Sequence, residues 1–435
     1  MEHSKARFRN PWFWVPSLYL AEGVPYIVAV TVSVVLYKRL GISNTDIALY
    51  TSWLYLPWVI KPFWSPFVDL FRTKRFWIVA AQLLIGASLA CVALTITGPA
   101  FFRYSLAFLW IMAFSSATHD IAADGFYMLA LGQDEQAAYV GVRTTFYRVA
   151  SIAAKGALVI LAGRLEMKGV AVATAWSITF FVAAAFFLAL FLYHAFLLPR
   201  PVADRPVPRD VSGTTLPAEF WRMIALFFRK KDIGVILAFF LFYRFAETQL
   251  VKMVAPFLLD PRTKGGLGLT TAEVGFVYGT VGVVALTLGG LLGGYAVYRK
   301  GLRYWLWIMV FTMHLPDLIF VYLAYAQPQN LLTINLAVAV EQFGYGFGFT
   351  AFTMYMIMIA DGDCKTVHYA ISTGIMALGM MLPAMGSGWI QEQLGYQHFF
   401  VWVVISTIPG FIVAALVNID PAFGKRAENG KEGCR

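Results

Sequence analysis

Residues 12–37 read WFWVPSLYLAEGVPYIVAVTVSVVLY, and this stretch decides the fold class. Its only charged side chain is Glu22, and as a helix it is long enough to cross the roughly 30 Å hydrocarbon core of a bilayer. It is too long for the apolar region of a cleaved signal peptide, so we expect it to remain as a membrane-spanning helix.

The composition of the whole chain agrees with this interpretation. Of its 435 residues, 59% are hydrophobic and 13% are charged, whereas a soluble domain carries about a quarter charged residues. Apolar runs between charged or Gly/Pro/Asn breaks predict twelve segments near 12–37, 47–68, 75–97, 104–131, 137–163, 170–198, 233–258, 272–298, 303–325, 331–358, 367–391 and 398–418. We therefore expect an all-α membrane protein with twelve transmembrane helices.

The segments fall into two similar sets of six. A hydrophilic, proline-rich linker at 199–231 separates residues 1–198 from residues 232–435, and Leu20-Ala21-Glu22 resembles Phe245-Ala246-Glu247. Internal duplication is typical of alternating-access transporters, which hold a solute near the midplane between two halves. We expect two pseudo-symmetric six-helix bundles, the second followed by a short tail.

The basic residues predict the orientation. Of the 34 Lys and Arg residues, 21 fall in segments on the side of the N-terminus, and seven fall on the other side: Lys38, Arg39, Arg103, Arg164, Lys168, Arg262 and Lys264. The positive-inside rule then predicts that both termini and the linker are cytoplasmic. The formal charge of +10 is thus explained without a nucleic-acid partner.

A dozen charged residues remain inside the predicted spans. They are the bases Lys61, Arg143, Arg148, Lys155, Arg244 and Lys252, and the acids Glu22, Asp120, Asp124, Glu247, Asp317 and Glu341. Each costs about 2.5–3.5 kcal/mol in mid-bilayer on insertion scales, so we expect them to face one another or a water-filled cavity.

Depth along the helices predicts pairs between the fourth and fifth segments. Asp124 and Arg143 lie at equal distances from the turn near Asp134, while Asp120 and Arg148 lie one helical turn deeper. These pairs could be structural clamps, because buried charges are usually paired. The fifth segment has more bases than the fourth has acids, so Arg148 or Lys155 could instead bind an anionic solute.

Glu22 is the main candidate for proton coupling. It precedes Gly23 and Pro25, where a helix can break and expose backbone groups to a ligand. A buried carboxylate without a fixed cation can take up and release a proton near neutrality. An ion pair of Glu22 with Arg148 or Lys61 is the alternative, and Glu247 has Arg244 as a local partner.

The site residues can be grouped by expected role. Glu22, Asp120 and Asp124 are assigned to proton coupling; Tyr26, Lys61, His119, Tyr147, Arg148, Lys155, Glu247 and Glu341 are assigned to substrate binding. The three cysteines are scattered and lack metal-ligand spacing, so we expect no metal and no cofactor.

The turn after the second segment has the residues of a two-state latch. Asp69 could bond to helix N-termini or basic side chains only when that side is closed, with Arg72 and Arg143 as partners. The stretch 64–75 resembles the loop signature of the major facilitator superfamily, and the matching turn at 293–303 lacks the acid. The alternative is simple positive-inside anchoring.

Within that superfamily, several stretches resemble the AmpG-type muropeptide permeases and related acetyl-CoA transporters. They are Glu22-Gly23-Val24-Pro25, the run 56–69 (LPWVIKPFWSPFVD), the run 115–125 (SSATHDIAADG), in which His119 replaces the usual Gln, Tyr147-Arg148, and Tyr369-Ala370. The resemblance implies proton-driven import of an anionic anhydro-muropeptide, by a monomer, across the bacterial inner membrane.

Other functions stay open at this point. Related families carry siderophores, other oligosaccharides or acetyl-CoA. A non-transporting membrane receptor would have little reason to keep so many buried charges. His119 and Asp124 match the spacing of an acyltransferase motif, but they lie inside a predicted span with no soluble catalytic domain.

Overall fold

The computed structural model describes residues 10–202, 204–205, 216–360 and 365–425. In these residues, all regular structure is helical. In the first part of the chain the helices are η1 (Pro11–Phe13), α2 (Val15–Ile27), η2 (Val28–Val32), α3 (Ser33–Arg39), α4 (Asn44–Trp53), α5 (Leu56–Leu70), α6 (Lys74–Thr95), α7 (Phe101–Ala130), α8 (Gln133–Ser151), η3 (Ile152–Leu158), α9 (Val159–Met167) and α10 (Val172–Leu197).

The second part of the chain begins with one connecting helix. Its elements are α11 (Leu216–Phe228), α12 (Ile233–Phe242), α13 (Phe245–Leu259), η4 (Arg262–Lys264), α14 (Thr271–Phe276), η5 (Val277–Val281), α15 (Gly282–Lys300), α16 (Leu302–His314), α17 (Asp317–Ala326), α18 (Leu331–Ile359), α19 (Lys365–Ile405) and α20 (Ile408–Leu416). Polar caps fix several starts: the side chains of Ser43, Thr73 and Thr270 each accept a hydrogen bond from a backbone N–H of α4, α6 and α14.

These elements make twelve membrane-length spans in the described residues. Nine stretches are long and apolar enough to cross a bilayer, and the last of them, Val367–Leu416, bends at Gly395 (φ 70°) and holds two spans. Residues 44–70 and Leu331–Ile359 supply the remaining two. The protein is therefore a multi-pass membrane protein, as its sequence predicts.

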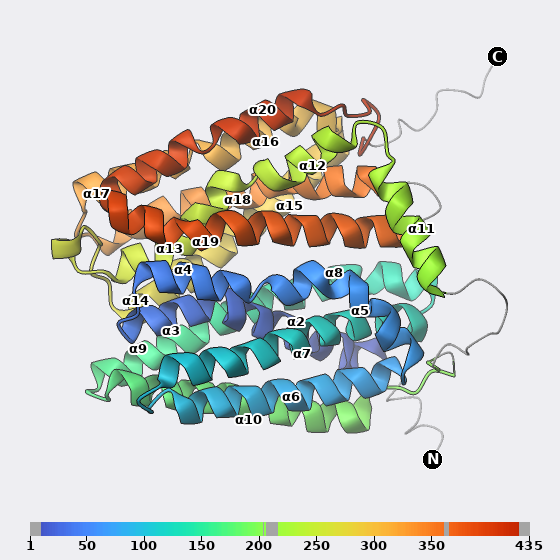
Figure 1. Cartoon of the computed structure of the whole chain (residues 1–435), viewed down its shortest axis with the longest axis horizontal. Coiled ribbons are helices and arrows are strands. Elements are labelled where there is room, and N and C mark those ends of the chain that lie inside the picture. The colour runs from blue at the N-terminus through green and yellow to red at the C-terminus, as the bar shows by residue number, and fades with distance from the viewer. Residues whose placement is uncertain (1–9, 203, 206–215, 361–364, 426–435) are drawn as a thin grey trace.

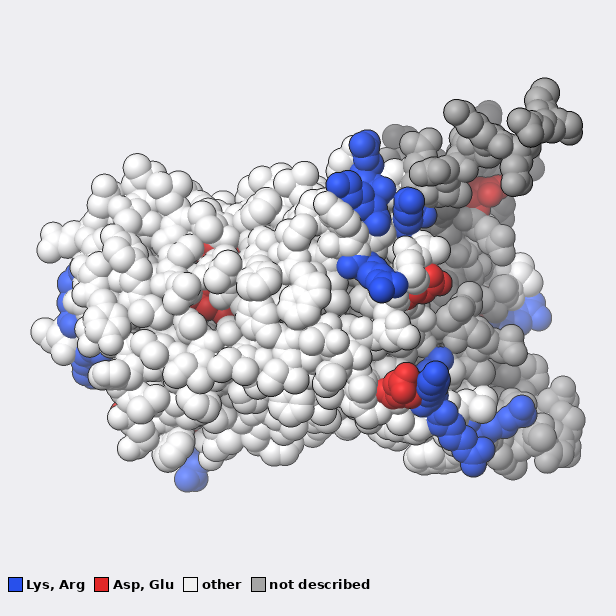
Figure 2. All heavy atoms as spheres, turned by 90° about the horizontal axis from the view of Figure 1, so that it is seen from above, with Lys and Arg blue, Asp and Glu red and all other residues white. Residues whose placement is uncertain are grey.

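The helices lie side by side in two layers (Figure 1). Helices α2 to α10 form one layer, here the N-terminal half, and α12 to α20 form the other, the C-terminal half. Helix α11 lies at one end of the bundle, which we name the α11 end; α14 and α17 mark the opposite end. On the face shown in Figure 2, Lys and Arg gather towards the two ends, and the band between them is mostly uncharged, with a few acidic atoms at its surface.

The two halves meet tightly near the opposite end. There α4 packs on α19, α13 on α3, and α9 on α14. Glycines allow the backbones to approach: a Cβ on Gly388 of α19 would lie 2.0 Å from the carbonyl oxygen of Asn44, and one on Gly163 of α9 would lie 2.2 Å from the amide nitrogen of Ala272.

Polar contacts close the same end, and we name this group the seal. Lys38 pairs with Asp260 at 2.7 Å, and Tyr396 donates to the Asp260 carboxylate at 2.6 Å. Asn44 donates to the Gln391 side chain at 2.5 Å and to the Tyr396 hydroxyl at 3.0 Å. Because the seal joins the halves, the bundle is closed at the opposite end.

Candidate functional site

A cavity of about 740 Å³ lies between the two halves. Arg72, Lys74, Asp204 and Arg205 line it at the α11 end, so it opens towards that end. Deeper in, its wall carries the acids Glu22, Asp120 and Asp124, the bases Lys61 and Arg143, and the aromatic residues Tyr26, Tyr55, Trp58, Tyr147 and Tyr369. Most of this wall belongs to the N-terminal half.

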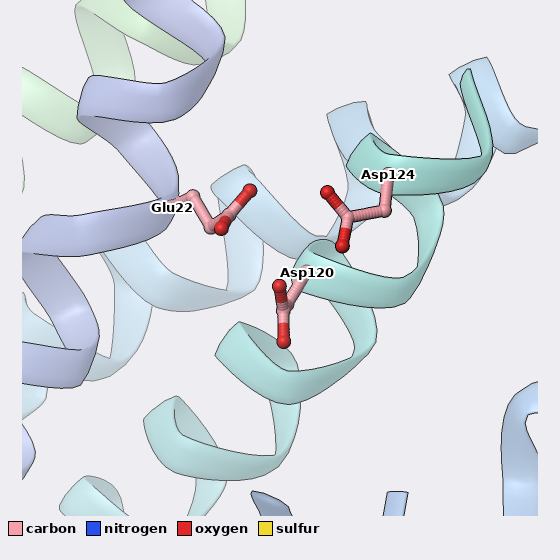
Figure 3. Close-up of side chains that lie close together, drawn as sticks. All are labelled: Glu22, Asp120 and Asp124. Carbon is pink, nitrogen blue, oxygen red and sulfur yellow. The ribbon is translucent and has the colours of Figure 1, made fainter. Parts of the chain in front are cut away.

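Three carboxylates of the cavity wall lie close together (Figure 3), and we name them the carboxylate triad. Asp120 and Asp124 share a face of α7 through i, i+4 spacing, and Glu22 reaches them from α2. One oxygen from each lies within 4.8 Å of the others. Gly23 lets α2 approach α8 closely, since a Cβ there would lie 2.7 Å from the Ala150 Cβ.

Two bases contact this triad. Lys61 of α5 donates to Asp120, and Arg143 of α8 pairs with Asp124 at 2.7 Å. Arg143 also lies over the ring of Tyr19 at 4.6 Å, and the Tyr19 hydroxyl donates to Asp124 at 3.3 Å. The predicted Asp124–Arg143 pair is confirmed. The predicted Asp120–Arg148 pair is wrong. Asp120 pairs with Lys61 of α5, and the depth argument had compared only the fourth and fifth segments.

Glu22 is the triad member without a base of its own. Its side chain is 8% exposed, and its Oε2 has no hydrogen-bond partner among the described residues. Neither Lys61 nor Arg148 forms the ion pair that was the alternative for Glu22. Three ionised carboxylates against two bases would leave one negative charge, which a single proton neutralises. The triad oxygens could also ligate a small cation, although two of the carboxylates already hold bases.

Aromatic rings form the deeper wall of the cavity. Tyr26 packs edge-on against Trp58 at 5.0 Å and against Tyr55 at 6.2 Å between ring centroids. Tyr147 completes this wall from α8. Tyr55 and Trp58 were not expected as site residues from the sequence, because an aromatic residue in a membrane span is usually a packing residue.

Arg148 and Lys155 lie outside the cavity wall. Lys155 is on the π-helical turn η3, with its Nζ 4.9 Å from the ring centroid of Tyr278 on η5 in the other half. In the part of the chain described, neither base forms an ion pair. Arg148 and Lys155 therefore have no carboxylate partner among the described residues, and neither lies beside the triad.

His119 points away from the cavity. It is fully buried and hydrogen-bonds to Gln82 at 3.0 Å, and Gln82 in turn bonds to His194 at 2.8 Å. The cause is helical geometry, because consecutive residues on α7 point about 100° apart and Asp120 faces the cavity. The structure therefore places His119 in the packing between helices and not at the substrate-facing wall.

Glu247 and Glu341 also lie away from the cavity, buried within the C-terminal half. Both are fully buried; Glu341 accepts from Gln342 at 3.0 Å, and neither Glu247 oxygen has a described hydrogen-bond partner. The local Arg244–Glu247 pair is wrong: Arg244 donates to the Tyr345 hydroxyl instead. The structure does not bring these acids to the triad.

Of the three predicted latch residues, Arg72 lies at the mouth of the cavity. The Asp69 side chain lies outside the described residues. Arg72 is exposed, has a left-handed backbone (φ 128°) and lies 5.5 Å from the Phe76 ring centroid. Arg143, the third predicted member, belongs to the triad.

Comparison with known proteins adds independent information. A sequence model described as Major Facilitator Superfamily matches residues 18–362. The chain is 24% identical over 412 residues to a Rickettsia conorii protein provisionally named transporter AmpG 4, covering 92% of this chain and 95% of that one. It is 24% identical over 403 residues to the anhydromuropeptide permease of Escherichia coli K12, covering 91% and 77% respectively.

The fold is also similar to solved structures. A crystal structure of a D-xylose-proton symporter superposes with a TM-score of 0.72 at 12% identity, covering 97% of this chain and 99% of that one. At this identity, the likeness shows the shared fold alone. The two relatives described above are named a transporter and a permease, so the acyltransferase alternative is excluded.

Proposed function

The chain belongs to the major facilitator superfamily, and on that premise we propose that this transporter imports an anionic, cell-wall-derived sugar or peptide together with protons. Import would proceed by alternating access, with the cavity opening in turn at the α11 end and at the opposite end. The observation that carries the proposal is the carboxylate triad, with its one uncompensated acid, in the wall of a solute-sized cavity.

The charge balance of the triad supports proton coupling. With Lys61 and Arg143 in place, one carboxylate remains without a base, and Glu22 has the unpartnered oxygen. A negative charge left in this site would be costly, so a bound proton favours the conformation in which the triad is enclosed. Proton release to the other side would then reset the transporter.

The lining of the cavity supports a sugar-containing solute. Aromatic rings such as Tyr26, Trp58 and Tyr147 offer flat apolar faces on which the C–H faces of sugar rings pack, while Lys61 and Arg143 offer hydrogen-bond donors. The relative from Escherichia coli is named an anhydromuropeptide permease, which supports this class of solute. Muropeptides carry carboxylates, in agreement with the bases Arg148 and Lys155 at the interface.

The placement of basic residues supports an orientation. We assign the α11 end, with both termini, to the cytoplasm of a bacterial inner membrane, and the opposite end to the exterior. The cavity described above then faces the cytoplasm, from which an imported solute is released. We expect the protein to act as a monomer.

Uptake into liposomes tests the proposal. Purified protein would be reconstituted and supplied with labelled N-acetylglucosaminyl-anhydro-muramyl tripeptide, with and without an inward proton gradient. The expected result is uptake that the gradient stimulates and that unlabelled muropeptide competes away. A siderophore, another oligosaccharide and acetyl-CoA serve as alternative solutes; transport of one of these, with no muropeptide uptake, would overturn the substrate assignment.

A further inference from the structure

Lys252 is a buried base that the proposal above does not use. It lies on α13 in the C-terminal half and is 4% exposed. Its Nζ donates to the Thr51 hydroxyl of α4, in the other half, at 3.0 Å and lies 5.6 Å from the Tyr55 ring centroid. No carboxylate pairs with it among the ion pairs of the described residues.

Lys252 lies between the cavity and the seal. Tyr55 forms part of the cavity wall, and Lys252 is on the side of its ring that faces α13. Asp260 of the seal lies about 12 Å further along the chain at the helical rise. Lys252 therefore lies between the opposite end and the cavity, where a solute that enters from that end can contact it.

Lys252 has few polar partners while the opposite end is closed. A lysine ammonium group has three N–H donors, and among the described residues a single hydroxyl and one aromatic face replace water around it. Burying a charge with so few partners is unfavourable. When α4 and α13 separate at the opposite end, the ammonium group becomes accessible to water and to an entering solute.

We propose that Lys252 binds a carboxylate of the solute while the opposite end is open. When α4 closes against α13, Thr51 and Tyr55 take the place of that carboxylate, and the solute moves on into the cavity. An anion bound to Lys252 stabilises only the state in which it can reach the lysine, so the same contact selects an anionic solute and weakens before release. The identity of the anion rests on the proposed function. The proposal that Lys252 is accessible only while the opposite end is open does not rest on it.

Paired solutes test the selectivity. Initial uptake rates of the muropeptide and of its carboxamide analogue give a ratio of KM values, which we expect to favour the acid by roughly tenfold in the wild type. Lys252→Gln is expected to bring this ratio close to one, and Lys252→Arg to restore most of it. Lys264→Gln, at an exposed position of the same end, is the matched control and should leave the ratio unchanged.

Two outcomes would overturn this proposal. In one, Lys252→Gln slows uptake of both solutes equally, as a purely structural lysine would. In the other, the wild-type ratio survives in Lys252→Gln. If wild-type protein imports neither solute, the proposed function fails, and a measurement without solute decides the role of Lys252.

That second measurement uses spin labels across the seal. Labels on Met167 and Gln393, both exposed, report the distance between the halves at the opposite end, on a chain whose three cysteines are replaced by serine. Lys252→Gln removes the buried charge and is expected to reduce the fraction of molecules open at that end by several-fold. Lys252→Arg keeps the charge and should keep the wild-type fraction of open molecules. An unchanged distance distribution in Lys252→Gln would contradict the proposal.

Discussion

Asp124 and Arg143 join α7 to α8 at the wall of the cavity through an ion pair in which each side chain is 34% exposed. Equal depth on consecutive antiparallel helices brought them together in the prediction, and they lie 2.7 Å apart in the structure. The partner of Asp120 could not be found in this way, because Lys61 comes from a helix that is not adjacent in the sequence. The direction of His119 depends on how α7 is rotated about its axis, which packing determines.

Breaking the Asp124–Arg143 pair should destabilise the protein. Each side chain is 34% exposed, so we expect Arg143→Gln to lower the free energy of unfolding by about 1–2 kcal/mol, less than the loss typical of a fully buried pair. Thermal unfolding in detergent measures this loss. The double variant Asp124→Asn/Arg143→Gln removes both charges and should recover about half of the loss; a double variant as unstable as the sum of the single ones would show that the pair is not coupled.

At the level of elements, hydropathy predicted the spans well and their irregularities poorly. The predicted segment 331–358 agrees with α18, Leu331–Ile359, because a long apolar run has one favourable arrangement in a bilayer. The π-helical turns η2, η3 and η5 were not predicted, since each follows from packing against another helix. Helix α11 lies in the predicted linker and was also missed.

The glycine at the α4–α19 contact gives a prediction for an element. Gly388→Ala places a Cβ 2.0 Å from the Asn44 carbonyl oxygen, and such overpacking costs typically 1–3 kcal/mol. We therefore expect the variant to open the seal, so that spin labels on Met167 and Gln393 move apart in most molecules. Gly386→Ala is the control on the same helix, because a Cβ there meets no atom within 4 Å. Equal behaviour of the two variants would show that the α4–α19 contact does not hold the seal.

For the whole molecule, the internal repeat predicted two similar halves. It did not predict that their matching acidic residues lie in different surroundings. Glu22 and Glu247 occupy matching positions in the sequence, yet Glu22 lines the cavity and Glu247 is fully buried in its own half. The sequence could not separate the two, because burial depends on how the halves meet. A cavity that opens at the α11 end, with the carboxylate triad in its wall, and a seal at the opposite end are the arrangement expected of one state in an alternating-access cycle.

Glu22 is the residue that we propose carries the proton coupled to solute movement. Glu22→Gln removes the acid and keeps its shape, so exchange of labelled for unlabelled solute should continue in the absence of net proton movement. Accumulation driven by a proton gradient should be lost. Both activities can be measured on the same liposomes, with labelled muropeptide as the solute.

For Glu22→Gln, we expect exchange at the wild-type rate together with at least a tenfold loss of gradient-driven accumulation. If gradient-driven accumulation persists in Glu22→Gln, the coupling proton resides on another group.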